Sequence, residues 1–382
     1  MEPISLHVYD AQGKHISALP YGDLSWKDSI SDAGSMSCTI PYAPMTASLD
    51  MTRILREYGT IWLAKTGDRV LHAGWMTDWK LDDDQQSVSV DIGGGWTIWE
   101  KRLVLNHALA SSWKDGTVLI DDENPPGDWV LTLTGTLRDI ARGLLEESIK
   151  WGSLPYALPK VQGGSSNTRT YQCWDMATVS DRLGDIADLE DGPEIRFDPQ
   201  LEDFGMSFTL NVGSPEIVDH EWKWNTLIPG QRVMLTGIDA SGDLIATESY
   251  GVGGKNDDNV LVARTSSANL TGQGWPVLQM GNTSHSSVGV LATLQSYVAS
   301  DVTSGDEPQL TVGLSCGIEH DVHVGDHIDL RIHPNGMTAG ILRRVTGVTV
   351  ETNSAILPLK VTDVSGSADK EWLELQTRIR GQ

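Results

Sequence analysis

The feature that most constrains this chain is a β-strand pattern that occurs twice, once near each end. Residues 59–92 and residues 325–361 each run through an alternating strand, a polar turn, an Ala-Gly pair and a longer alternating stretch. In both, the glycine of the Ala-Gly pair, Gly74 or Gly340, follows the leading glycine by 15 positions (74 − 59 and 340 − 325). Self-similarity of this kind predicts a duplicated β unit with one strand order in both copies.

Two similar units in one chain also suggest how the chain assembles. Three copies around an axis present six similar faces, which suits a six-fold partner. The duplication therefore favours a homotrimer within a symmetric assembly over an enzyme that works alone. It predicts that the two kinds of β unit alternate around the axis.

Length and patterning divide the chain into four expected parts. At 382 residues it is too long for one simple core, and its patterning is mostly that of β-strands interrupted by helical segments. We expect a mainly β fold with α+β inserts, in which two related small β-barrel domains accompany helix-containing insert domains. The expected parts are an N-terminal β-barrel domain at 1–105, an α+β insert domain at 106–220, a second β-rich insert with a helix at 221–305, and a C-terminal β-barrel domain at 306–382.

Four helices are expected within these β-rich segments. The clearest spans 135–149, where Thr136 is a suitable cap and the apolar residues form one stripe. The glycine-rich segment at 251–255 lacks the spacing of a phosphate-binding loop, and acidic residues follow it, so it is predicted to be a hairpin tip. The other three helices are expected at 47–57, 175–189 and 286–299.

The charge balance argues against stable binding of nucleic acid. Against 28 Lys+Arg stand 52 Asp+Glu, a formal net charge of −24, whereas a protein that holds phosphates needs Lys and Arg to displace counterions. The simpler interpretation of the acidic surface is solubility. The more specific one is a repulsive wall that polyanions pass without adhering.

Neither a leader nor a membrane span is expected. The sequence has no basic region followed by an apolar stretch at its start, and no apolar run of about 18 residues, so we expect a soluble protein assembled in a bacterial cytoplasm. Cys38, Cys173 and Cys316 lie far apart and form no CxxC pair, which indicates reduced structural thiols.

One cluster of metal-ligand residue types occurs near the second repeat. Its spacing matches no common zinc motif, and on a strand its first histidine would point away from the other two. We therefore assign no metal, cofactor-binding or catalytic residue, and we expect a polar hairpin end there. Carboxylate pairs are too abundant to be informative, and no serine-hydrolase elbow or His-Glu-x-x-His motif occurs. The cluster comprises Cys316, Glu319, His320, Asp321, His323 and His327.

The chain has 14 tryptophans, and these allow two interpretations. Exposed indole faces serve as platforms for sugars, but alternating β patterns favour burial in a core or a subunit interface. Trp222 and Trp224 are two positions apart and should share one face of a strand. The residues weighed as sugar platforms are Trp75, Trp79, Trp96 and Trp99.

Several segments carry a family resemblance. The stretch from Leu24 to Pro41, followed by 55–63, 73–77 and 88–95, is similar to the opening of the baseplate hub proteins of long-tailed (siphovirus-type) phages, often called minor tail proteins. The later order also fits, and the resemblance covers nearly the whole chain through patterns rather than through catalytic motifs. The later segments are Gly192-Pro-Glu-Ile-Arg-Phe, Tyr250-Gly-Val-Gly, a helix at 288–299 and Val324-Gly-Asp-His-Ile-Asp-Leu.

This resemblance implies a trimeric structural hub at the virion tail tip. Such a hub closes the tail tube and connects the distal tail ring and the tape-measure end to a central fibre or spike, with DNA only in transit through its lumen. Many such hubs carry an added C-terminal lysin or peptidase, whereas little of this chain follows Val364, so we expect a hub without enzymatic activity. Two alternatives stay open: a receptor- or carbohydrate-binding tail protein with exposed aromatic platforms, and a cell-wall hydrolase with a perturbed acid in a cleft.

Overall fold

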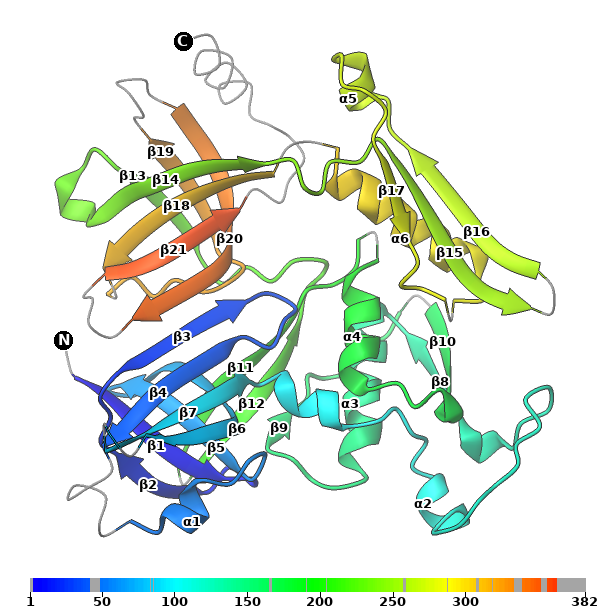
Figure 1. Ribbon diagram of the computed structural model, residues 1–382, viewed down its shortest axis with the longest axis horizontal. Coiled ribbons are helices and arrows are strands. Elements are labelled where there is room, and N and C mark those ends of the chain that lie inside the picture. The colour runs from blue at the N-terminus through cyan, green and yellow to red at the C-terminus, as the bar shows by residue number, and fades with distance from the viewer. Residues whose placement is uncertain are drawn as a thin grey trace. The chain divides into compact units, whose positions relative to one another are not determined.

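The computed structural model divides the chain into two compact units (Figure 1). The first comprises residues 1–187, 193–217 and 349–354, and the second comprises 188–192, 218–348 and 355–382. Each strand is described below with the unit that holds most of it. The residues that the structure describes are 3–41, 49–82, 84, 86–164, 167–189, 191–203, 205–256, 259–286, 288–306, 309–317, 319–332, 339–351 and 356–362.

The first unit is built on a seven-stranded antiparallel sheet in the order β3-β4-β7-β6-β5-β1-β2. Apolar residues alternate with polar ones along β4 and β7, so one face of the sheet is buried. The strands are β1 (Ile4–Asp10), β2 (His15–Leu19), β3 (Leu24–Ser29), β4 (Ser35–Pro41), β5 (Thr60–Thr66), β6 (Arg69–Asp82) and β7 (Ser87–Gly94).

The remainder of this unit mixes helices with short strands. β10 pairs with β8, and β12 pairs with both β11 and β9. The elements are α1 (Met51–Ile54), α2 (Leu109–Ser112), β8 (Val130–Gly135), α3 (Leu137–Ile149), β9 (Tyr156–Ala157), β10 (Asn167–Gln172), α4 (Val179–Ala187), β11 (Ile195–Glu202) and β12 (Gly205–Val212), with one-turn 3-10 helices at Thr97–Lys101, Gly127–Trp129 and Cys173–Asp175.

An aromatic cluster forms the centre of the first unit's core. Trp99 packs edge-on against Tyr156, with ring centroids 4.8 Å apart, and Tyr156 stacks on Phe208. The buried Tyr156 hydroxyl donates to the carbonyl of Gly95 and accepts from the Trp75 indole at 2.9 Å. These hydrogen bonds satisfy the buried hydroxyl of Tyr156 and the indole of Trp75, so the aromatic residues tie the sheet to β12 and β9.

The second unit contains a six-stranded sheet in the order β14-β18-β21-β20-β19-β13. All neighbours are antiparallel except β13 and β19, which are parallel. The strands are β13 (Glu221–Asn225), β14 (Val233–Ser241), β18 (Gln309–Gly317), β19 (His327–Ile332), β20 (Ala339–Glu351) and β21 (Ile356–Thr362), and a 3-10 turn at Pro229–Gln231 precedes β14.

An insert separates β14 from β18. It is a three-stranded sheet in the order β16-β15-β17, and α6 packs on one face through Leu294 and Val298. Figure 1 shows this helix running along the sheet. The elements are β15 (Glu248–Asn256), β16 (Asn259–Ser266), α5 (Asn269–Gly272), β17 (Gln279–Asn282) and α6 (Leu291–Ser304).

The strand order confirms that one β unit is repeated. Five strands, β3-β4-β7-β6-β5, recur in the same spatial order and the same chain order as β14-β18-β21-β20-β19. In both units the register shifts by one at a threonine, Thr77 in β6 and Thr346 in β20. Each strand then continues for five more residues, to Asp82 or Glu351. The shared bulge fixes the alignment of the two copies.

The equal glycine spacing is a coincidence within this repeat. Gly74 lies three residues before the bulge of its strand, whereas Gly340 lies six residues before its bulge. The reason is the preceding connection, which has two residues between β5 and β6 but six between β19 and β20. The repeat is therefore real, but its two Ala-Gly pairs do not occupy equivalent positions.

The expectation of barrels is wrong for the part of the chain that is described. Neither sheet closes there, because no ladder joins β2 to β3 or β13 to β14 within a unit. The strand that follows the five repeated strands also differs between the two sheets, because β1 lies antiparallel to β5, but β13 lies parallel to β19. A mainly β fold with helix-containing inserts is confirmed, while the four expected domain boundaries stay a prediction.

The helices agree with the sequence where a cap and an apolar stripe coincide. Thr136 caps α3 by accepting from the amide of Asp139 at 3.1 Å, as predicted. The helix expected at 47–57 is present only as α1. Its start is capped by Asp50, and at its end the Thr60 hydroxyl donates a hydrogen bond to the carbonyl of Ile54. Residues 47 and 48 lie outside the described residues.

Two other helices begin later than expected. Met176 adopts a left-handed conformation with φ 52°, so the helix expected at 175–189 begins only at α4. The helix expected at 286–299 becomes α6, because the carbonyl of Val288 accepts from the Gly254 amide at 2.8 Å and keeps the preceding chain extended against β15.

The prediction of a hairpin tip at 251–255 is wrong. These residues lie inside β15, directly beneath α6. A Cβ added to Gly251 would lie 2.6 Å from a Val298 methyl, and one added to Gly253 would lie 2.7 Å from the Val288 carbonyl. Glycine is used here for close packing of helix on sheet, which gives the same residue pattern as a turn.

Candidate functional site

The most elaborate polar cluster of the second unit centres on Asp326, the residue directly before β19. Its carboxylate is fully buried. It accepts hydrogen bonds from the backbone amides of His220 and His323 and from the Trp222 indole, each at 2.9 Å. The Nδ1 atom of His220 lies 3.6 Å from the same carboxylate. A buried carboxylate is tolerated because it receives this set of donors.

Histidine and tryptophan rings surround this carboxylate. His320 packs edge-on against Trp222 and Trp224, with ring centroids 5.8 and 5.5 Å apart, and its Nε2 lies 2.9 Å from the carbonyl of Gln231. His323 lies between two aspartates, 3.4 Å from Asp219 and 3.3 Å from Asp321. The cluster fastens β13 and the loop before β19 to the sheet.

The structure brings together only part of the predicted ligand-type cluster. His320, Asp321 and His323 lie in the loop between β18 and β19, not on a strand as assumed. Cys316 is buried within β18, and Glu319 instead pairs with Arg232 at 2.9 Å. Across the described ranges no group of three or more His, Cys, Asp or Glu is arranged to hold a metal ion.

Sequence reasoning missed Asp326, the residue that organises this cluster. Two of its three donors lie 104 and 106 positions away in sequence, so no local pattern marks them. The one local signal is the Val324-Gly-Asp-His turn before an alternating strand, where a buried Asp is uncommon without partners.

The tryptophans divide as the alternating pattern suggested. Trp75, Trp96 and Trp99 are buried in the first unit's core, which excludes them as exposed sugar platforms, whereas Trp79 is 43% exposed. Trp222 and Trp224 share one face of β13, as predicted, since their ring centroids lie 5.7 Å apart.

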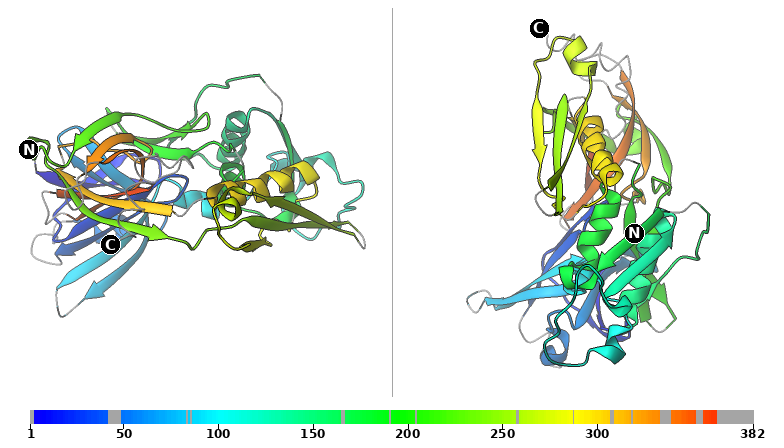
Figure 2. Two further views of the ribbon diagram at one scale, coloured as in Figure 1. Left: turned by 90° about the horizontal axis from the view of Figure 1, so that it is seen from above. Right: turned by 90° about the vertical axis from the view of Figure 1, so that its right-hand side faces the viewer.

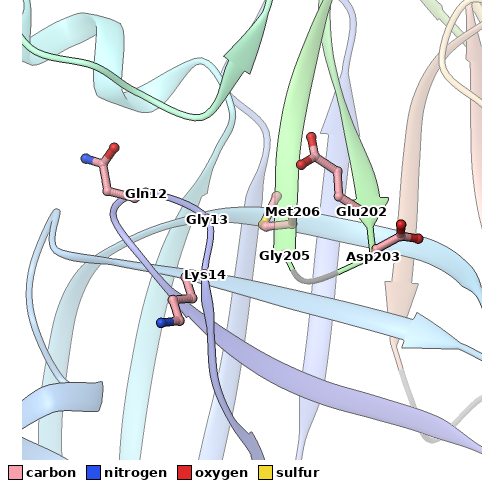
Figure 3. Close-up of a pocket in the computed structure, with 7 residues that line it drawn as sticks. All are labelled: Gln12, Gly13, Lys14, Glu202, Asp203, Gly205 and Met206. Carbon is pink, nitrogen blue, oxygen red and sulfur yellow. The ribbon is translucent and has the colours of Figure 1, made fainter.

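A shallow depression of about 370 Å³ lies in the first unit, between the turn of β1 and β2 and the turn of β11 and β12. The two turns are in close backbone contact. The amide of Met206 donates a hydrogen bond to the carbonyl of Gly13 at 2.8 Å, and a Cβ added to Gly13 would collide with the carbonyl oxygen of Met206. In Figure 3 the side chains of Lys14 and Glu202 extend away from one another. The lining residues, Gln12, Gly13, Lys14, Glu202, Asp203, Gly205 and Met206, therefore show no converging acid, base or nucleophile.

None of the helices described is long and apolar enough to cross a membrane. No family model matches this sequence, and no curated protein matches it either.

Solved structures of phage tail proteins are similar to this chain over nearly its whole length. The tail protein from Neisseria meningitidis MC58 has a TM-score of 0.56 at 13% identity, covering 97% of this chain and 98% of that one. The prophage MuSo2 43 kDa tail protein from Shewanella oneidensis has a TM-score of 0.56 at 10% identity, covering 94% and 98%. The prophage tail protein gp18 from Listeria monocytogenes EGD-e has a TM-score of 0.51 at 10% identity, covering 99% and 100%.

Identities this low establish the fold alone. The chain has the fold of these phage tail proteins, in agreement with the resemblance to phage tail proteins found in its sequence. Because the likeness spans both units and their inserts, it describes the whole architecture rather than one common β motif.

Proposed function

We propose that this protein is the structural baseplate hub of a phage tail tip. In this role a homotrimer closes the tail tube and connects the distal tail ring and the tape-measure end to the central fibre or spike. The likeness to phage tail proteins over nearly the full length supports this role most directly. The repeated five-strand unit adds to it, because three copies then supply six similar faces.

Labelling of particles tests the location. Gold-conjugated antibody against the purified chain, applied to virions of a phage whose genome encodes it, should bind at the distal end of the tail. Labelling along the shaft or on the capsid would contradict the proposal. An unrelated tail-shaft antibody serves as the control for access to the particle surface.

We also propose that the chain acts without catalysis. The depression in the first unit has diverging side chains. In the second unit, His220 lies beside Asp326, and His323 lies between Asp219 and Asp321. Zymography on host cell walls tests this, and a cleared band would favour the hydrolase alternative. A saccharide array would likewise reveal sugar binding, for which Trp79 is the one exposed member of the four candidate tryptophans.

A further inference from the structure

The strand β6 extends beyond its neighbour β5. Its pairing with β5 reaches only Trp75, whereas its pairing with β7 continues to Asp82. Figure 2 shows this light-blue hairpin projecting from the sheet of the first unit in both views. Over residues 77–81, which we term the β6 edge, the backbone has no strand on the β5 side among the residues described.

The β6 edge carries two large apolar side chains in solvent. Trp79 and Leu81 are each 43% exposed. They pair across the ladder with Val90 and Val88, which are buried, so all four lie on one face. The Trp79 indole is held in place by a hydrogen bond of 2.9 Å to Glu57. The buried face of the sheet thus ends in an uncovered apolar margin.

The strand β14 presents a second uncovered edge, in the second unit. It has nine residues and pairs only with β18, so its other side, which we term the β14 edge, has no strand partner in the described ranges. Met234 on this strand is 53% exposed. The strand contains no Lys, Arg or Pro, the residues with which proteins usually protect an exposed edge.

Two other outermost strands, β2 and β13, differ from β14 in length or charge. β2 has five residues, and β13 has five and carries Lys223. A long apolar edge without such protection is either an aggregation site or a docking site. By this criterion the β14 edge calls for an occupant in the assembled protein. The β6 edge carries Lys80, and it calls for one because Trp79 and Leu81 are exposed beside it.

We infer that the β6 edge of one copy pairs with the β14 edge of a second copy. This inference rests on the proposed trimer and names the surface that forms it. Strand addition supplies main-chain hydrogen bonds to both edges, and covers Trp79, Leu81 and Met234. Because the two edges belong to different strands, the contact is heterologous, and a heterologous contact forms a closed ring when its rotation closes.

Charge favours a second copy as the occupant. Two chains of formal charge −24 repel each other over most of their surfaces. The β6 edge, however, carries one aspartate and one lysine, and β14 carries a single aspartate. These edges are places where two acidic copies can approach without strong repulsion.

Cross-linking of two single-cysteine variants tests the inference. Lys80→Cys marks the β6 edge and Thr236→Cys marks β14; both positions are exposed. The native cysteines are buried and do not compete for reagent. A short bismaleimide tolerates small differences in register. Covalent dimers should form several-fold more in the mixture of the two variants than in either variant alone.

A matched control replaces Lys80→Cys with Lys114→Cys, an exposed lysine of the same unit that lies off the β6 edge; this pair should give no enrichment. Leu81→Lys should shift the protein toward monomer, with an unchanged circular dichroism spectrum.

Three outcomes would overturn the inference. Cross-linking within Lys80→Cys alone would indicate an isologous contact. A trimer that survives Leu81→Lys and gives no mixed cross-link would assemble through other surfaces, leaving the proposed hub intact. A chain that stays monomeric at its highest soluble concentration, with no mixed product, would contradict the pairing, whereas a stable two-fold dimer would instead overturn the proposed function itself.

Discussion

At the scale of single residues, Asp326 organises the polar cluster of the second unit through its hydrogen bonds. Its carboxylate joins β13, the loop before β19 and the Trp222 ring, although these lie far apart in sequence. This explains why β13 can add to the sheet in parallel, since the carboxylate holds the start of that strand beside the start of β19.

Replacing Asp326 by Asn should destabilise the second unit by about 2 to 4 kcal/mol, because buried donors would lose a charged acceptor. Equilibrium urea unfolding followed by tryptophan fluorescence measures this, since Trp222 and Trp224 lie beside the carboxylate. Asp329→Asn, at an exposed position of the same strand, is the control and should change stability by less than about 0.5 kcal/mol. Equal effects of the two changes would show that the buried carboxylate has no special role.

The cysteines make a second prediction at this scale. Burial, aided by Asp91, raises the pKa of the Cys38 thiol to about 12, and burial, aided by Glu319, does the same for Cys316. Burial also raises the pKa of Cys173. At pH 8 the thiolate, which is the reactive form, is therefore scarce in the folded protein. A disulfide reagent should find no reactive thiol at pH 8 before denaturation and three afterwards; rapid reaction of the folded chain would contradict this burial.

At the scale of elements, the insert of the second unit depends on close packing of α6 on β15. Gly251→Ala places a methyl group 2.6 Å from Val298 and 3.1 Å from Leu294. We expect a loss of about 1 to 3 kcal/mol from this overpacking. Gly281→Ala in the adjacent β17 meets no atom within 4 Å and is the matched control. Thermal unfolding of both variants measures this loss of stability. A stabilised Gly251→Ala protein would contradict the prediction and would mean that α6 can move away from β15 without cost.

The same elements show what the sequence could predict. The apolar stripe and the N-terminal cap of α3 could be predicted from the sequence, because helix formation is local and Thr136 lies next to the helix that it caps. Gly251 was misread because a turn and a packed helix–sheet contact both require glycine, and only the position of α6 distinguishes them. The repeat was found, but its alignment was set by the bulges at Thr77 and Thr346, which leave no residue pattern of their own. Asp326 was missed because all its partners but one are distant in the chain.

At the scale of the whole molecule, the acidity of the chain makes a prediction about the proposed trimeric ring. Three copies carry three times the formal charge of −24. Carboxylates that face the lumen would repel DNA phosphates and prevent adhesion, but screening limits this effect to about 8 Å at physiological salt. In a structure of the trimer, the excess of Asp+Glu should therefore be at least as dense on the lumen as on the exterior. A neutral or basic lumen would indicate that the acidity serves solubility alone.

Assembly in isolation depends on concentration, since ring contacts strengthen when partners raise the local concentration of the chain. In a ring of three copies, the duplicated unit would give six similar lobes. One kind of contact between two different edges, applied three times, gives three-fold symmetry with six similar lobes, whereas contacts between identical edges give two-fold symmetry.

The most direct test is therefore electron microscopy of the concentrated chain, with the particle mass taken from the same preparation. The account predicts a ring with three times the 41.6 kDa mass of one chain, three-fold symmetry and six similar lobes around its axis. A two-fold dimer, or a ring with another number of copies, would contradict it.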